Sequence, residues 1–215
     1  MYRCCEINRK TNETNIFIKL DLDGIGNSKI STTIPFLDHM LSHISKHGKF
    51  DIILSASGDT HIDEHHLIED IGITIGQAID KCLVDKKGIE RFGFSSLPMD
   101  ETLVECSLDI SGRPFLVYNM DIYKQYLNCE NNISVKILKK IQEFSKEKEK
   151  YELYKHFFYS LSYNCGLTLH FNLKYGENLH HNLEATFKAF GQALKKAVII
   201  NKKYENDLPS TKGII

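Results

Sequence analysis

Patterns of apolar and polar positions along the chain predict short strands interspersed with longer helices. Apolar and polar residues alternate over residues 14–21, which is the period of a strand with one buried face. We expect residues 29–33 to be its antiparallel partner, because the turn sequence Asp23-Gly24 lies between them. A turn at Ser111-Gly112 is likewise expected to return residues 103–110 into residues 114–119. The other expected elements are strands over residues 50–57 and 167–174 and helices over residues 36–47, 64–83, 153–163 and 179–200. Helices beside short antiparallel strands indicate the α+β class.

One sequence pattern occurs twice. His-His-Leu-Ile-Glu at residues 65–69 returns as His-His-Asn-Leu-Glu at residues 180–184, and Gly-Gln-Ala follows both copies at the same spacing. A further histidine precedes each copy at a similar distance, His39 in the first and His156 in the second. Two copies of one plan suggest duplication. We therefore expect an internally duplicated α+β fold with repeats over residues 1–95 and 96–215, each a small sheet packed against helices and related by a pseudo-two-fold axis.

The stretch from residue 123 to residue 150 differs from the rest of the chain. Lysine and glutamate alternate over residues 146–150, and Ile133, Ile137, Ile141 and Phe144 have the spacing of one helical face. This favours an amphipathic helix with a solvated side, and a charged binding tail is the alternative. We expect a charged helical insertion near residues 123–152 of the second repeat.

Composition excludes several classes of protein. The 215 residues carry 27 Lys and Arg against 28 Asp and Glu, and this net charge of -1 argues against a nucleic-acid partner. The sequence lacks an apolar run of membrane-spanning length and an N-terminal signal core, so no membrane partner is expected. The expected location is the cytoplasm, or a plastid if a transit segment has been removed. The six cysteines form no CxxC pair, which favours free thiols.

Histidine carries the chemical signal. All ten histidines lie within residues 39–66 and 156–181. On a helix, residues i and i+4 share a face, so His65 converges with Glu69 and His180 with Glu184. The neighbouring histidine points about 100° away and serves a different place. Imidazole with carboxylate suits Mn, Fe or Zn, whereas the alternative is a pair of core histidines.

Five segments in order along the chain carry a resemblance to a known family. They are Phe-Leu-Asp-His-Met-Leu at 36–41, Asp-Glu-His-His-Leu-Ile-Glu-Asp at 63–70, Pro-Met-Asp-Glu at 98–101, Ser-Gly-Arg-Pro at 111–114 and residues 180–189. The chain resembles the imidazoleglycerol-phosphate dehydratases. This implies a hydro-lyase of L-histidine biosynthesis that converts imidazole glycerol phosphate, a small phosphorylated imidazole, to imidazole acetol phosphate. It also implies two Mn²⁺ ions per active site, and homo-oligomers built from trimers, up to a 24-subunit shell, with active sites at subunit interfaces.

The resemblance assigns roles to individual residues. One ion would be bound by His39, His66, His180 and Glu184, and the other by His65, Glu69, His156 and His181. Glu13 and His47 match positions beside the substrate and are the candidates for catalysis. The candidates for holding the phosphate are Arg91, Arg113, Lys188, Ser210, Thr211 and Lys212. Four of the metal ligands, His39, His65, Glu69 and His180, are also expected to contact the substrate.

The expected chemistry uses the substrate's own imidazole ring. Bound between two cations, the ring is held as an imidazolate whose electron density expels hydroxide, and the side-chain proton of the resulting diazafulvene is then acidic. Glu13 is the expected proton carrier, although an acid in a strand sequence is commonly a solvated surface group. A metal-dependent hydrolase and a non-catalytic metal store are the two alternatives.

Other polar residues near the motifs have less specific interpretations. His43 shares the face of His39 and is expected to pack or to bond to a ligand rather than to bind metal. His61 and His170 are expected to be structural or to support the ligands. For Asp100 and Glu101, a structural role and a part in the site both remain open.

Overall fold

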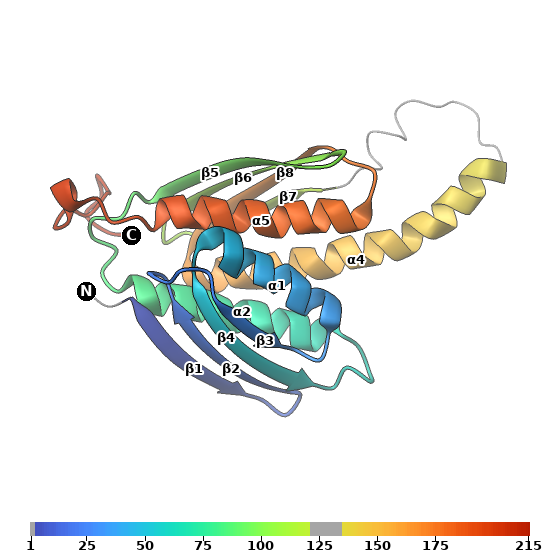
Figure 1. The fold of residues 1–215 in the computed structure, drawn as a ribbon, viewed down its shortest axis with the longest axis horizontal. Coiled ribbons are helices and arrows are strands. Elements are labelled where there is room, and N and C mark those ends of the chain that lie inside the picture. Colours follow the sequence, from blue (N-terminus) through green and yellow to red (C-terminus); the bar gives the residue numbers. More distant parts are fainter. Residues whose placement is uncertain (1–2, 121–134) are drawn as a thin grey trace.

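The computed structural model describes residues 3–120 and 135–215, and over residues 135–147 it describes the backbone alone. A sheet lies on each outer side, with the helices between the two sheets (Figure 1). The first half contains β1 (Cys4–Lys10), β2 (Thr14–Asp21), β3 (Ser28–Ser31), α1 (Pro35–Gly48), β4 (Asp51–Gly58) and α2 (His65–Leu83). The second half contains β5 (Phe92–Met99), β6 (Thr102–Ile110), β7 (Phe115–Asn119), α4 (Val135–Cys165), β8 (Leu167–Tyr175) and α5 (Leu179–Ala197). A short 3-10 helix, Lys202–Tyr204, follows α5.

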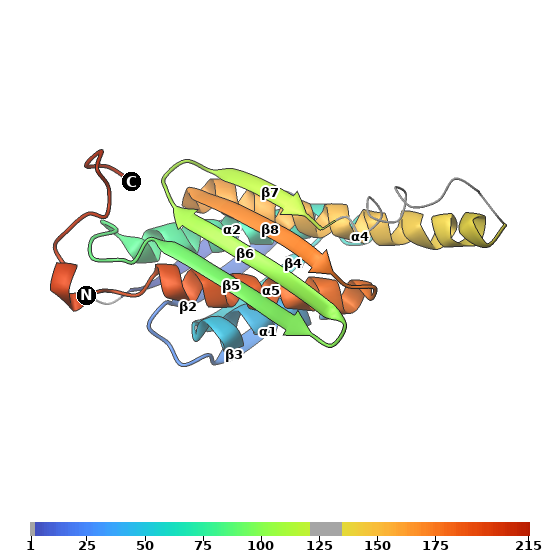
Figure 2. The same cartoon turned by 90° about the horizontal axis from the view of Figure 1, so that it is seen from above.

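The two halves share one topology. The first sheet has the order β1-β2-β4-β3 and the second the order β5-β6-β8-β7, and Figure 2 shows the second sheet lying over the helices. In each sheet the last pair, β3 with β4 and β7 with β8, is parallel, and the other pairs are antiparallel. The expected duplicated α+β fold is therefore confirmed.

Two of the strand pairings expected from the sequence are wrong. β3 lies beside β4 rather than β2, and β7 lies beside β8 rather than β6. A helix connects the members of each parallel pair, and such a pair needs a crossover connection of this kind. Alternation along one strand says nothing about which strand becomes its neighbour. The sequence analysis also missed the edge strands β1 and β5, and the expected division between residues 95 and 96 falls inside β5.

The expected helices are present with altered ends. α1 and α2 match the sequence interpretation closely, whereas α5 ends at Ala197, after which Ile200 forms a β-bridge with Ile89. α4 extends the helix expected at residues 153–163 back to Val135. The apolar face expected on residues 133–144 lies outside the described side chains. Of the helices described, none is both long and apolar enough to span a membrane.

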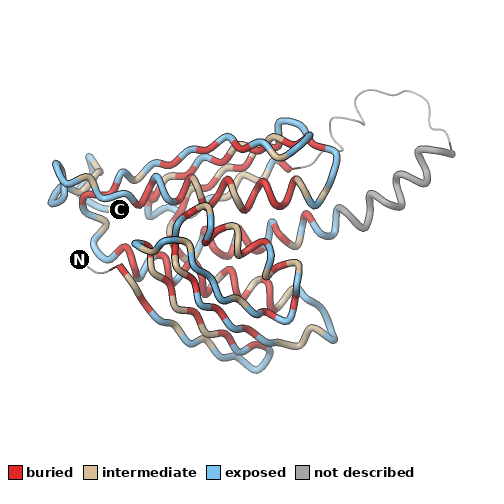
Figure 3. The backbone as a smooth tube through the Cα atoms, viewed as in Figure 1, coloured by how far each residue is buried: buried red, intermediate tan, exposed pale blue. Residues whose placement is uncertain are grey.

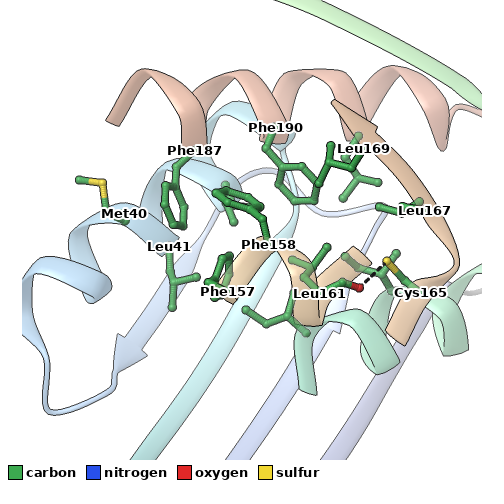
Figure 4. Packing of buried hydrophobic residues seen from close by; sticks show 14 of the residues in the cluster. Met40, Leu41, Phe157, Phe158, Leu161, Cys165, Leu167, Leu169, Phe187 and Phe190 are labelled. Atoms are coloured by element: carbon green, nitrogen blue, oxygen red, sulfur yellow. Dashed lines mark hydrogen bonds between the residues drawn. The ribbon is translucent and has the colours of Figure 1, made fainter. Parts of the chain in front are cut away.

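Aromatic side chains fill the space between the helices. Phe157 and Phe158 of α4 pack against Phe187 and Phe190 of α5, with ring centroids 4.9 to 5.5 Å apart for three of the pairs (Figure 4). All four phenylalanines are fully buried. Burial alternates along the strands, whose inner faces meet this core (Figure 3). Burial of these apolar side chains is the main force that holds α4 against α5 within the second half.

The glycine of each Gly-Gln-Ala motif allows close approach between helices. A Cβ atom at Gly76 of α2 would lie 2.5 Å from the carbonyl oxygen of Leu161 in α4. A Cβ atom at Gly191 of α5 would lie 2.9 Å from the carbonyl oxygen of Ile44 in α1. Each motif helix thus packs tightly against the helix that carries the upstream histidine of the other half, and this contact assembles the sites described next.

Candidate metal centre

The first cluster joins α1 to α5 and consists of His39, His180 and Glu184; we call it the α1–α5 cluster. The Nε2 atoms of His39 and His180 lie 3.2 Å and 3.1 Å from Oε2 of Glu184. The candidate ligand atoms of all three residues lie within 4.8 Å of one another. The Glu184 side chain is 9% exposed, whereas both imidazoles are about half exposed. Two imidazoles and a carboxylate that converge in this way match the donors that Mn²⁺, Fe²⁺ and Zn²⁺ prefer.

The second cluster lies at the equivalent place between α2 and α4 and consists of His65, Glu69 and His156, whose candidate ligand atoms are more widely spaced than those of the first; we call it the α2–α4 cluster. Nε2 of His65 lies 3.4 Å from Oε2 of Glu69, one helical turn away. The ring centroids of His65 and His156 are 4.9 Å apart. Each half of the chain therefore contributes its upstream histidine to one cluster and its His…Glu pair to the other.

Polar side chains bond to the backbone at the start of both motif helices, from the N-cap residue in α5 and from the residue before the N-cap in α2. The Asn178 side chain accepts hydrogen bonds from the backbone N–H groups of His180 and His181, at 2.9 Å and 3.3 Å. Asp63 accepts an equivalent bond from the N–H of His65 at 3.0 Å. Asn and Asp are favoured in this position because they satisfy N–H groups that a helix leaves unpaired at its start.

The remaining two expected ligands, His66 and His181, lie outside the clusters. Nδ1 of His66 contacts Oδ2 of Asp59 at 3.1 Å, and Glu13 lies 3.9 Å away. Nδ1 of His181 contacts Oε2 of Glu101 at 2.8 Å. Within one chain the structure thus brings together three of the four ligands expected for each ion.

Sequence reasoning missed Asp59 as the partner of His66 and left the role of Glu101, the partner of His181, open. Asp59 directly follows β4, and the residue order contains no signal that it faces His66. Glu101 stands at the turn between β5 and β6, and Glu13 stands at the corresponding turn between β1 and β2. The shared position of these two acids, each one residue before a buried threonine, is a signal that could have pointed to Glu101.

The electrostatics of the α1–α5 cluster centre on Glu184. Burial alone would raise the pKa of this carboxyl group, but the Lys188 ammonium at 2.5 Å and the nearby imidazoles outweigh burial and lower the pKa to about 2. His43 lies 3.3 Å from Oε1 of Glu184, and its burial lowers its pKa to about 4. His47 lies next on the same face of α1, and burial followed by the charge of Lys188 lowers its pKa as well. His43 thus lies beside both the Glu184 carboxylate and Nε2 of His39, which is 3.4 Å away, and its lowered pKa favours the neutral imidazole.

The two histidines outside the clusters, His66 and His181, have raised pKa values, in contrast to the lowered pKa values of His43 and His47. The hydrogen bond that His66 donates to Asp59 raises the pKa of His66, and the bond that His181 donates to Glu101 raises the pKa of His181. The pKa of Glu101 is in turn lowered to about 2 by its bond to His181. Both pairs are charge-assisted hydrogen bonds, which are stronger than neutral ones.

The expected phosphate-binding residues lie in two places. The guanidinium of Arg91 donates two bonds to the Asp109 carboxylate, at 2.7 Å and 3.1 Å, and a third of 2.7 Å to the carbonyl oxygen of Pro209. Arg113 donates to the carbonyl oxygen of Ser111 at 3.2 Å. Lys188 lies apart from both arginines, beside Glu184 in the α1–α5 cluster.

The C-terminal tail passes close to the two arginines. Ser210 donates to the carbonyl oxygen of Ile214 at 2.8 Å and accepts from the N–H of Lys212 at 3.3 Å, and the exposed Thr211 lies between them in the chain. The tail lies at one end of the molecule, whereas α2 and α5 begin at the other (Figure 1). α5 alone is about 28 Å long, so the tail and the histidine clusters of one chain do not meet at one small substrate.

Comparison with known proteins identifies the family. The family model described as imidazoleglycerol-phosphate dehydratase matches residues 32–194. Proteins with that name from Trichlorobacter lovleyi and Thermodesulfovibrio yellowstonii are each 46% identical to this chain, over 100% and 99% of it respectively and over 100% of their own length. The crystal structure of the dehydratase from Staphylococcus aureus matches with a TM-score of 0.71 and 33% identity, covering 92% of this chain and 99% of that one. The structure from Pyrococcus furiosus matches with a TM-score of 0.71 and 31% identity, covering 97% and 100%. The resemblance in the motifs therefore extends over the whole sequence and fold, and the chain belongs to the imidazoleglycerol-phosphate dehydratase family.

Proposed function

We propose that this protein removes water from imidazole glycerol phosphate to give imidazole acetol phosphate, a hydro-lyase step of L-histidine biosynthesis. The observation that carries the proposal is the pair of clusters, each with two imidazoles and one carboxylate, at equivalent places in the two halves. The full-length relatives named as dehydratases of this substrate support it.

Two Mn²⁺ ions per active site would fit these clusters. His39, His180 and Glu184 would hold one ion, and His65, Glu69 and His156 the other. We propose that His66 and His181 complete the two sets from other copies of the chain, because within one chain each is bonded to a carboxylate outside the clusters. We further propose that the chain forms a homo-oligomer built from trimers, up to a 24-subunit shell, with active sites at subunit interfaces; the positions of His66 and His181 support the sharing of sites between copies.

The chain's own residues have separate tasks in this reaction. When bound, the ions withdraw electron density from the substrate's imidazole ring and ease loss of the hydroxyl group. Glu13, at the β1–β2 turn and about half exposed, carries the proton between the substrate side chain and water. His47 and Lys188 lie beside the α1–α5 cluster, where they orient the substrate.

The substrate's phosphate requires donors at the other end of the molecule. Arg91 offers a planar guanidinium already fixed by Asp109, and Arg113 lies in a tight turn after β6. The tail residues Ser210, Thr211 and Lys212 add a hydroxyl pair and an ammonium group. Because these groups lie far from the clusters of their own chain, they would serve a site formed with a neighbouring copy.

A direct assay tests this function. The purified chain is loaded with Mn²⁺ and incubated with imidazole glycerol phosphate, and the keto product is detected by its hydrazone. We expect product with the loaded protein, none after removal of metal with EDTA, and recovery when Mn²⁺ is restored. Full metal loading without product would contradict the proposal and leave the hydrolase and metal-store alternatives.

A further inference from the structure

Two histidines use a different ring nitrogen from the histidines bonded to the cluster glutamates. In both clusters, the imidazole atom that faces the glutamate is Nε2, as in His39, His65 and His180. In His66 and His181 the atom that faces a carboxylate is Nδ1. This opposite orientation occurs at equivalent positions of the two halves.

Glu101 is well anchored for its contact with His181. Its Oε2 atom receives the bond from Nδ1 at 2.8 Å, and its Oε1 atom accepts the backbone N–H of Asn178 at 3.1 Å. The Glu101 carboxylate thus fixes both the start of α5 and the imidazole ring of His181. The neighbouring Asp100 lies 3.8 Å from Nε2 of His181, beyond hydrogen-bond distance, and its side chain is 76% exposed.

Asp59 makes the corresponding contact with Nδ1 of His66, but from the end of β4 rather than from the β1–β2 turn. Its backbone is fixed at both ends, because its N–H donates to the carbonyl oxygen of Glu13 and its own carbonyl oxygen accepts from Ile62. Its side chain is 16% exposed, and Oδ2 lies 3.1 Å from Nδ1 of His66. The Asp59 backbone is therefore fixed, whereas its second carboxylate oxygen, Oδ1, is buried without a hydrogen-bond partner among the described residues.

An imidazole that donates its Nδ1 proton to a carboxylate has its lone pair on Nε2, the atom that can bind a metal. We propose that Asp59 and Glu101 are positioning residues that fix His66 and His181 in this tautomer and aim their Nε2 atoms at the metal clusters of other copies of the chain. This inference rests on the proposed function, because it concerns the same two ions. It assigns a task to two acids that do not themselves bind metal.

The competing interpretation is that these acids bind ions of their own. Glu13, Asp59 and His66 have candidate ligand atoms within 4.8 Å of one another, as do Asp100, Glu101 and His181. In both groups, however, the imidazole atom closest to a carboxylate is Nδ1, at hydrogen-bond distance from it. An ion at that place would require loss of the hydrogen bond, and the number of ions per chain separates the two interpretations.

The test measures Mn²⁺ binding by the full chain with a fluorescent metal indicator, together with thermal unfolding of the metal-free protein. His39→Ala and His156→Ala each abolish one ion and so identify the two binding steps. Glu101→Gln is then expected to weaken the ion abolished by His156→Ala by about 10- to 100-fold and to leave the other ion unchanged. Asp59→Asn is expected to weaken the ion abolished by His39→Ala to a similar extent and to leave the other ion unchanged. Asp100→Asn, at the same turn as Glu101, is the matched control and should bind both ions as the wild type does.

Each further outcome is decisive. Asp59→Glu and Glu101→Asp keep a carboxylate and should recover part of the affinity. Equal binding by Glu101→Gln and Asp100→Asn, more than two ions per wild-type chain, or lower thermal stability with unchanged affinity would each overturn the inference. If the wild type binds two ions and forms product while these variants match it, only the inference fails. If the wild type binds no Mn²⁺, the proposed function fails with it.

Discussion

The two clusters that we propose as metal sites have matching candidate ligands but different surroundings. Four residues after its glutamate, the α1–α5 cluster has Lys188, whereas the α2–α4 cluster has Ile73 at that position. Four residues after its upstream histidine, the first has His43 and the second Ser160. Glu184 is 9% exposed and paired with an ammonium group, whereas Glu69 is 41% exposed. Duplication thus preserved the ligands, while the residues around them diverged so that one cluster is charge-balanced without metal.

The largest expected effect separates the two acids at equivalent turns, Glu13 and Glu101. Glu13→Gln removes the proposed proton carrier and should lower kcat by about 10²- to 10⁴-fold while two Mn²⁺ ions remain bound. Glu101→Gln should instead act through metal affinity, so excess Mn²⁺ should restore much of its activity. Steady-state assays at increasing Mn²⁺, with metal analysis of each variant, compare the two. Retained turnover in Glu13→Gln would refute its role.

The glycines of the repeated motif provide a second comparison. Gly76→Ala places a methyl group against the Leu161 carbonyl, and Gly191→Ala places one against the Ile44 carbonyl, at the longer of the two distances. We expect both to lower the free energy of unfolding by about 1–3 kcal/mol, with the larger loss for Gly76→Ala. Urea unfolding of the metal-free chains measures this. Equal stability of both variants and the wild type would show that the helices do not pack as closely as described.

The charge difference between the clusters can be tested at Lys188. Lys188→Met leaves the buried Glu184 carboxylate without its ammonium partner and should destabilise the metal-free protein by about 1–2 kcal/mol. Added Mn²⁺ should recover most of this loss by supplying the missing positive charge. Ile73→Met is the matched change in the other cluster and should be nearly neutral. Equal thermal stability of the two variants without metal would remove the proposed asymmetry.

A smaller difference between the halves concerns the start of β4, which begins with Asp51, whereas the corresponding strand β8 begins with an apolar residue. Asp51 accepts hydrogen bonds from the backbone N–H groups of residues 25–27, at 2.8 to 3.0 Å, and these bonds lower its pKa. Because the folded pKa lies below the ordinary value of 3.8, the stabilisation is present above that pH and is lost as the pH falls below it. Asp51→Asn should cost less than about 1 kcal/mol at pH 7 and weaken the pH dependence below pH 4. The free energies of unfolding of the wild type and Asp51→Asn at pH 7 and pH 3 test this expectation. An equal loss of stability between the two pH values in both proteins would contradict it.

The sequence predicted what depends on local periodicity and missed what depends on contacts between distant segments. The spacing of His65 and Glu69 was enough to place them on one helical face, and the repeated motif was enough to predict two similar halves. The parallel pairing of β3 with β4 was missed, because a crossover helix decides it. Asp59 was missed although it lies only seven residues before His66, because the loop between β4 and α2 has no periodicity that would predict which of its side chains meet.

Mixing of two inactive variants tests the central claim that each metal set is shared between chains. His39→Ala damages the α1–α5 cluster, and His66→Ala damages the histidine proposed to reach that cluster from another copy. Both variants are treated with EDTA, mixed in equal amounts and reassembled with Mn²⁺, alongside wild type treated in the same way. Random mixing should restore about a quarter of the wild-type dehydration activity. About one site in four then combines an intact α1–α5 cluster from one chain with an intact His66 from another. A mixture as inactive as its components, with the wild type fully recovered, would contradict the account.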